Sequence, residues 1–152
     1  MKIEEKLDVL NLKLPPAPTP VGAYVPAVRA GNLVFVSGQI PRKEGKLIIG
    51  RVGEDLSAEE VGEAVRLATL GGLAALKSVV GDLDKVTRVV KVTGYVACIP
   101  GYTQQPEVLN HASNLLLAVF GEAGRHARAA VGVNDLPLGV PVEIEMIFEV
   151  SR

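Results

Sequence analysis

The sequence has no tryptophan, one cysteine and two histidines, and only 4% of its 152 residues are aromatic. The single cysteine, Cys98, excludes an intramolecular disulfide, and two histidines beside it do not make a dedicated zinc site. The 16 basic and 17 acidic side chains leave a formal charge of −1, so no strong field attracts phosphates, and few rings are present for base stacking. We therefore expect no metal, and we do not expect nucleic acid as a partner.

The sequence also lacks any run of about 20 apolar residues, which excludes a membrane-spanning helix. Acidic residues interrupt the first ten positions, so these do not resemble a signal peptide, and we expect a cytoplasmic protein with no membrane partner. Hydrophobic residues make up 48% and charged residues 22% of the chain, the balance of a folded globular protein. The length is that of one domain.

Residues 1–20 differ from the rest of the chain. Ile3, Leu7 and Leu10 repeat at helical spacing, which predicts a short amphipathic helix that docks only weakly. The segment Leu14–Pro20 holds four prolines and is expected to be an extended connector. We expect the main domain to span residues 21–152.

The main domain shows alternating strand and helix patterns. Ser57 and Glu60 have the spacing of a capping box, and the apolar stripe after them ends at Gly81, which predicts a long helix whose internal glycines pack close to a sheet. A second helix is expected from Pro106 to Phe120. The predicted strands are Tyr24–Arg29, Leu33–Val36 (buried on both faces), Lys46–Ile49, Val86–Cys98 (with Val86, Val90, Val92 and Val96 alternating), Ala129–Val133 and Val142–Val150, the first three forming a meander.

This order of elements predicts an α+β fold in which two helices cover one face of a single mixed sheet. The other face carries valine and isoleucine but has no helix to cover it, so we expect oligomerisation.

Few residues suggest chemistry by their type and spacing alone. Arg128 opens a strand and is followed by small residues, which fits either a carboxylate-binding group or a surface arginine. Glu143, Glu145 and Glu149 share one side of the last strand, either as its polar face or as functional groups. For His111 and Cys98 we favour a packed or solvent-facing histidine and an inert buried thiol.

Five stretches, in this order, resemble the RidA (YjgF, L-PSP endoribonuclease-like) family. The Ser37-Gly38-Gln39-Ile40-Pro41 signature is the most specific when it is combined with the later arginine and Glu-Ile-Glu. The stretches are Gly22–Tyr24, Gly31–Pro41, Ala127–Val131, Leu136–Pro137 and Val142–Glu145.

The resemblance implies a chorismate-mutase-like protomer in a homotrimer, with an inner barrel of strands and sites in the clefts between subunits. It also implies hydrolysis of reactive enamines and imines, such as 2-aminoacrylate, to a 2-keto acid and ammonia without a metal or organic cofactor. Arg128 would hold the carboxylate of this small substrate bidentately and Glu143 would position the attacking water. The implied substrate-binding residues are Tyr24, Ser37, Gly38, Asn110 and Ala130.

Two other functions fit the same sequence. A non-catalytic trimer that binds 2-keto acids or related metabolites would keep Arg128 but would tolerate loss of Glu143. An endoribonuclease or translation inhibitor, a role also ascribed to family members, would need an RNA affinity that the near-neutral charge disfavours. Three features indicate a divergent subgroup of the family: the extra N-terminal helix, Pro26 two residues after Tyr24, and the segment Ile99–Glu107.

Overall fold

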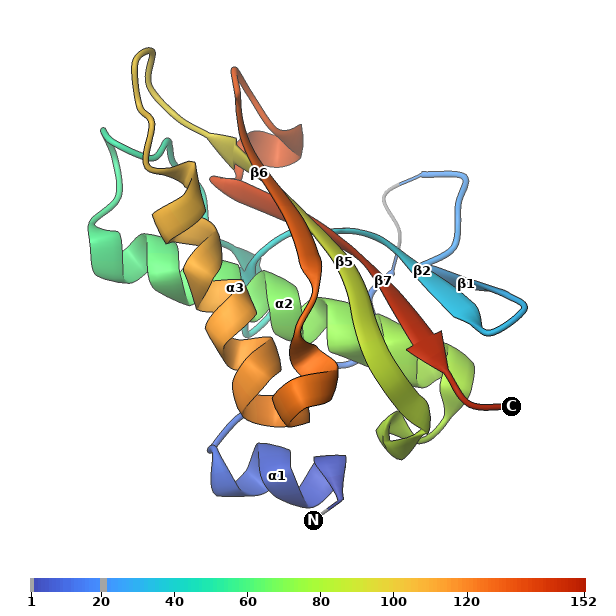
Figure 1. Ribbon diagram of the computed structural model, residues 1–152. Helices are drawn as coiled ribbons and strands as arrows, with labels where there is room; N and C mark the ends of the chain where they lie inside the picture. Colours follow the sequence, from blue (N-terminus) through green and yellow to red (C-terminus); the bar gives the residue numbers. More distant parts are fainter. Residues whose placement is uncertain (1, 20–21) are drawn as a thin grey trace.

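The computed structural model describes residues 2–19 and 22–152 and is built around one mixed five-stranded sheet (Figure 1). The strands run antiparallel except for the parallel pair β5–β6. Their order across the sheet is β1 (Ala27–Ala30), β2 (Leu33–Gln39), β7 (Val142–Val150), β5 (Val86–Ala97) and β6 (Ala127–Val133). The predicted single mixed sheet is therefore confirmed, while the predicted boundary between residues 20 and 21 lies outside the described residues.

Two long helices, α2 (Ala58–Val80) and α3 (Gln105–Phe120), lie on the same side of this sheet, as predicted (Figure 1). The capping box at the start of α2 is formed, because Ser57 Oγ accepts from Glu60 N at 3.1 Å and Ser57 N donates to Glu60 Oε1 at 3.0 Å. Gly81 ends the helix at a φ of +82°, a conformation that glycine adopts without a steric penalty.

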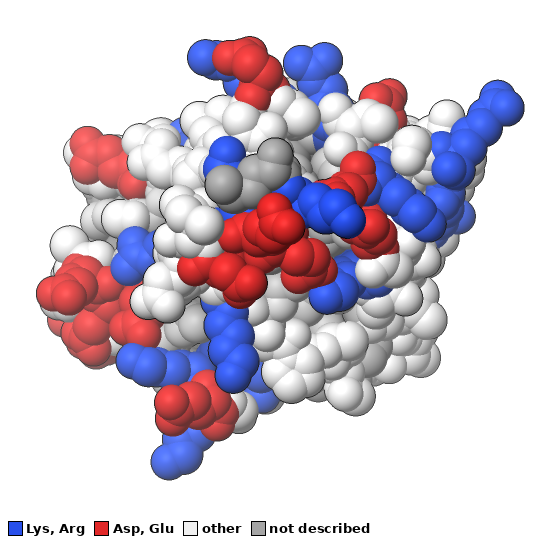
Figure 2. All heavy atoms as spheres, turned by 90° about the horizontal axis from the view of Figure 1, so that it is seen from below, with Lys and Arg blue, Asp and Glu red and all other residues white. Residues whose placement is uncertain are grey.

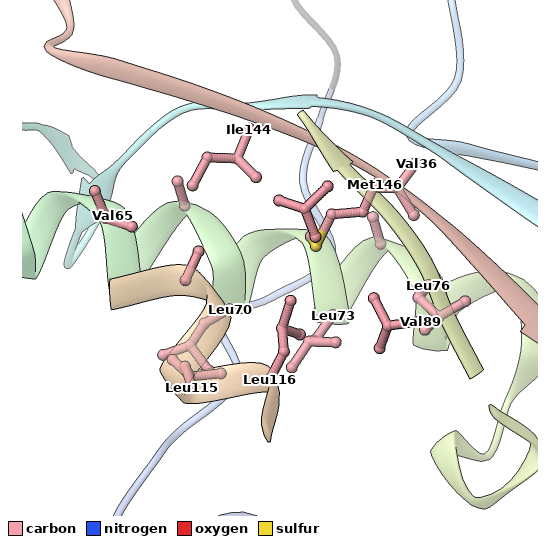
Figure 3. Close-up of a cluster of buried hydrophobic side chains, with 14 of the residues drawn as sticks. Val36, Val65, Leu70, Leu73, Leu76, Val89, Leu115, Leu116, Ile144 and Met146 are labelled. Carbon is pink, nitrogen blue, oxygen red and sulfur yellow. The ribbon is translucent and has the colours of Figure 1, made fainter. Parts of the chain in front are cut away.

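The core lies between these helices and one face of β7. Alternate residues of β7 are buried, and among them Met146 points toward α2 (Figure 3). A Cβ at Gly72 would overlap the methyl group of Met146, so this glycine lets the helix approach the sheet, as expected. Gly62 instead makes room for the ring of His111 on α3, which is a helix–helix contact.

The N-terminal helix α1 (Ile3–Val9) packs more firmly than expected. Leu7 is 2% exposed, Glu4 forms an ion pair with Lys77 of α2 at 2.6 Å, and Ile3 N donates to Asp84 Oδ1 at 2.7 Å. Leu7 is thus part of the main core, whereas Leu10 is partly exposed.

Figure 2 shows the molecule from below, where acidic and basic side chains are intermixed around a central group of acidic residues.

Two strand predictions were wrong in part. The first strand begins at Ala27 instead of Tyr24, directly after Pro26, which lacks the N–H that a ladder requires. The segment after Pro41 forms a separate small hairpin of β3 (Arg42–Lys43) and β4 (Lys46–Leu47), so the meander does not continue in the main sheet.

Among the described residues, the helices are too short or too polar to span a membrane.

Burial within two strands also differs from the predictions. Phe35 of β2 is 42% exposed in the single chain, on the sheet face that no helix covers, so this strand is not buried on both faces. In β5, Val89 is buried in place of Val90. The reason is a register shift between Val89 and Lys91, which leaves one extra residue on β5 and reverses the alternation on its N-terminal side.

Candidate active site

Glu143 lies over a bulge in β2, where the nearest residue, Gly38, has no side chain. Val36 pairs with Met146 and Gln39 pairs with Ile144, so two residues of β2, Ser37 and Gly38, stand opposite one residue of β7. A Cβ at Gly38 would lie 2.8 Å from Glu143 Cδ and would overlap its carboxylate. Gly38 is therefore required for the position of this carboxylate, and bulges of this kind often re-aim side chains next to active sites.

The Glu143 carboxyl titrates in an environment that disfavours its charge. Burial, and secondarily the charge of Glu145 two residues along the same strand, raise the pKa of Glu143 above its ordinary value of 4.5. Glu145 accepts a hydrogen bond from the Tyr95 hydroxyl at 2.6 Å, and this bond raises the pKa of Tyr95. A carboxylate whose pKa is raised is a stronger proton acceptor than an ordinary carboxylate, which suits a general base.

Ser37 connects the bulge to the segment that carries Tyr24. Its hydroxyl donates to the carbonyl of Val25 at 2.7 Å and its backbone N–H donates to the carbonyl of Pro26 at 2.9 Å. Tyr24 itself is 50% exposed. The structure thus gathers Ser37, Gly38 and Glu143 at the bulge and anchors the Tyr24 segment there.

Arg128 belongs to a different group, at the edge of the sheet beside α3. Its Nη1 donates to Asn110 Oδ1 at 2.8 Å and to Ser113 Oγ at 3.1 Å, and its Nη2 donates to the carbonyl of Pro106 at 3.3 Å. Ala130, two residues along β6, is partly buried against the core on the same side of the strand. Arg128, Asn110 and Ala130 therefore form a second group of predicted site residues.

The register of the strands places these two groups on opposite faces of the sheet. Arg128 is aligned with Val92, a fully buried residue on the helix-covered face. Glu143 is aligned with Tyr95, whose side chain points to the uncovered face because residues alternate along β5. Within the described part of one chain, the arginine and the glutamate do not form one site.

Three residues beside the predicted ones are not identified from the sequence: Ser113 is bonded to Arg128, Tyr95 is aligned with Glu143, and His126 is bonded to Ser113. Ser113 follows Asn110 by three positions, and this helical spacing already places both on one face of α3. Tyr95 is found only once the pairing of β5 with β7 is known. His126 precedes Arg128 by two residues on the same edge, and its partners become visible only in three dimensions.

A cavity of about 310 Å³ lies between α3, the start of α2 and the segment around Val52. Its polar lining consists of Tyr102, Glu107 and His111, and it contains none of the predicted site residues. Arg66 Nη1 donates to His111 Nδ1 at 3.1 Å, and burial together with the Arg66 charge lowers the pKa of His111. His111 is therefore a packed histidine, one of the two environments favoured from the sequence.

The comparisons with known proteins agree with this architecture. Residues 4–149 match the family described as "YjgF/chorismate_mutase-like, putative endoribonuclease". Protein TCP17 of Trypanosoma cruzi is 41% identical over 99% of this chain and 96% of its own length. A 2-iminobutanoate/2-iminopropanoate deaminase of Dermatophagoides farinae is 31% identical over 92% of this chain and 95% of its own length.

A solved structure has nearly the same fold. The protein Atu1372 of Agrobacterium tumefaciens, described as having unknown function, superimposes with a TM-score of 0.91 at 44% identity, over 98% of this chain and 92% of that one. The match to the family extends over nearly the whole chain and includes both groups of site residues. The chain is therefore a member of the YjgF/chorismate-mutase-like family, which includes the RidA proteins.

Proposed function

We propose that this protein hydrolyses small enamine or imine intermediates that carry a carboxylate, giving a 2-keto acid and ammonia. Two groups support the proposal. The Arg128 guanidinium is held by hydrogen bonds at the edge of the sheet, and the Glu143 carboxylate, whose pKa is raised, lies over Gly38. A relative that is 31% identical is named as a deaminase of such imines. The proposal requires no cofactor.

The proposed reaction needs one water and one proton carrier. In the imine form, the Glu143 carboxylate takes a proton from water as the water oxygen bonds to the imine carbon, and Glu143 gives this proton to the imine nitrogen, which forms a neutral carbinolamine. Glu143 then moves the hydroxyl proton of the carbinolamine to its amine nitrogen, the carbon–nitrogen bond breaks, and ammonia leaves as the hydroxyl oxygen becomes the ketone oxygen. Arg128 holds the substrate carboxylate by two charge-assisted hydrogen bonds, which fixes the reacting carbon near the water.

We further propose that the working site lies between copies of the chain in a homotrimer. Val28, Phe35 and Val131 lie on the uncovered sheet face and are 51%, 42% and 42% exposed in the single chain. An apolar sheet face of this kind is normally buried against a partner. Because Arg128 and Glu143 lie on opposite faces of one sheet, a second copy supplies the missing half of each site.

The direct test is ammonia release from 2-iminobutanoate generated in situ by an amino-acid oxidase, with catalase present and a no-protein control. We expect the wild type to accelerate release. Arg128→Ala should lose at least about tenfold in both affinity for 2-ketobutyrate and turnover, because it removes charge-assisted hydrogen bonds to the carboxylate. Arg42→Ala, a change at an exposed arginine of the small hairpin, is the matched control.

Glu143→Gln separates catalysis from binding. The amide keeps the shape of the side chain but does not accept a proton from water, so turnover should fall about 10²–10⁴-fold while 2-ketobutyrate binding persists. A wild type that binds 2-ketobutyrate but does not accelerate ammonia release would instead support a non-catalytic binding protein. RNA cleavage by a wild type that does not accelerate ammonia release, with cleavage lost in the Arg128→Ala variant, would contradict the deaminase proposal.

A further inference from the structure

The Arg128 side chain is held by a chain of hydrogen bonds that ends on a backbone carbonyl. Arg128 Nη1 lies 3.1 Å from Ser113 Oγ, and Ser113 Oγ lies 2.8 Å from His126 Nε2. His126 Nδ1 in turn lies 2.6 Å from the carbonyl oxygen of Gly124. The deaminase reaction proposed above assigns no role to Ser113 or to His126.

These hydrogen bonds have only one consistent direction when the imidazole is neutral. The Gly124 carbonyl only accepts, so the hydrogen is on His126 Nδ1 and Nε2 is an acceptor. The Ser113 hydroxyl then donates to Nε2 and is left with a lone pair toward Arg128. Ser113 therefore presents an acceptor to the guanidinium, and the hydrogen bond that it accepts comes from Nη1.

Counting donors shows which edge of Arg128 remains for a ligand. The guanidinium has five N–H groups. Asn110 and Ser113 both accept from Nη1, and the carbonyl of Pro106 accepts from Nη2. Among the described residues, the Nε hydrogen and one Nη2 hydrogen have no acceptor, and both atoms belong to the edge of the guanidinium that pairs with a carboxylate side-on.

We propose that Ser113 and His126 are positioning residues that fix the guanidinium of Arg128 with its Nε/Nη2 edge open to the substrate carboxylate. The proposal rests on the assignment of Arg128 as the carboxylate-binding group. Without the Ser113 acceptor, Asn110 is the one remaining acceptor of Nη1 among the described residues, and the guanidinium changes orientation more easily. Only some of these orientations present two parallel donors, so the carboxylate binds less tightly.

Two substitutions of His126 separate this role from a structural role in the turn at Gly124. The amide of glutamine reaches as far as Nε2 and can accept from Ser113, whereas the amide of asparagine reaches only as far as Nδ1 and can donate to the Gly124 carbonyl. We therefore expect His126→Asn to raise KM for the imine and Kd for 2-ketobutyrate about tenfold, with a smaller change in kcat, since a hydrogen bond to a charged group is lost. His126→Gln should restore values close to the wild type.

Ser113 provides an independent pair of variants. Ser113→Ala removes the acceptor from Arg128 and should show the same KM effect as His126→Asn, while Ser113→Thr retains the hydroxyl and should rescue binding. Ser78→Ala is the matched control, because the Ser78 hydroxyl donates only to the carbonyl of Ala75 on the preceding turn of α2. The proposal is overturned if Ser113→Ala binds 2-ketobutyrate as tightly as the wild type, or if His126→Asn behaves as the wild type and His126→Gln does not.

A measurement on the ligand-free protein keeps this test separate from that of the function. Rotation of the Arg128 guanidinium is followed by side-chain nitrogen NMR, assigned by comparison with Arg128→Ala. Distinct, slowly exchanging Nη signals are expected in the wild type and in His126→Gln, and averaged signals in Ser113→Ala and His126→Asn. If the wild type neither binds 2-ketobutyrate nor hydrolyses imines, the proposed function fails. Averaged Nη signals in the wild type would instead overturn the positioning role.

Discussion

The substitution Gly38→Ala should reduce turnover by displacing the Glu143 carboxylate, without removing any functional group. The new Cβ would stand 2.8 Å from Glu143 Cδ and closer still to the carboxylate. Carbon atoms in ordinary contact are separated by about 3.5–4.0 Å, so the carboxyl group must move by roughly 1 Å. A displacement of that size from the reactive geometry costs on the order of 10²-fold in rate.

The assay for this prediction is ammonia release from 2-iminobutanoate, measured together with Kd for 2-ketobutyrate. We expect kcat to fall about 10²-fold and Kd to change little, because in the proposed site the substrate carboxylate is held by Arg128 of another copy, which the change at the β2 bulge does not displace. Gly71→Ala is the control for a glycine-to-alanine change, since its new Cβ meets Gln39 Oε1 at an ordinary 3.4 Å. A folded Gly38→Ala protein with the wild-type kcat would refute the role given to the Glu143 carboxylate.

The other predictions concern pH and packing. Because burial and Glu145 raise the pKa of Glu143, kcat/KM should fall with decreasing pH through a limb above 4.5, and Glu145→Gln should move that limb to lower pH. Between 4.5 and the folded-state pKa the folded protein binds more protons than the unfolded chain, so the free energy of unfolding should decrease as pH rises through this window. Urea titrations at several pH values should show this decrease in the wild type and not in Glu143→Gln; the same decrease in both would contradict it. Gly71→Ala should stabilise the protein by up to about 1 kcal/mol through helix propensity. Gly72→Ala should destabilise it by about 1–3 kcal/mol, because the new Cβ overlaps the buried methyl group of Met146. Thermal unfolding compares the two variants, and equal melting temperatures would contradict the packing argument.

The regular elements follow from the sequence because their signals are local. The capping box at Ser57 and the alternation along Val142–Val150 need no knowledge of the rest of the fold, and both appear where predicted. The error at Lys46–Ile49 has a different origin. Pairing in the main sheet competes with pairing across the turn at Glu44 and Gly45, and nothing in the segment itself indicates which pairing prevails.

The arrangement of the candidate site is harder to predict from the sequence, because it depends on how distant segments pair. The resemblance to a family identified Arg128 and Glu143, but the faces on which they lie depend on two strand registers and on the bulge at Ser37 and Gly38. A one-residue change of register reverses the face of every side chain on a strand. The contact between Ser113 and His126 likewise joins a helix to the edge of a strand, and no spacing in the sequence predicts it.

The central claim, that each site takes its arginine from one copy of the chain and its glutamate from another, is tested most directly by complementation. Arg128→Ala and Glu143→Gln chains carrying different tags are coexpressed, and trimers containing both chains are isolated by two affinity steps. In a cyclic trimer each mixed species has one intact site, so about one third of wild-type activity is expected, while each variant alone keeps about one tenth of that activity or less. Mixed trimers as inactive as the separate variants would contradict a site shared between copies of the chain.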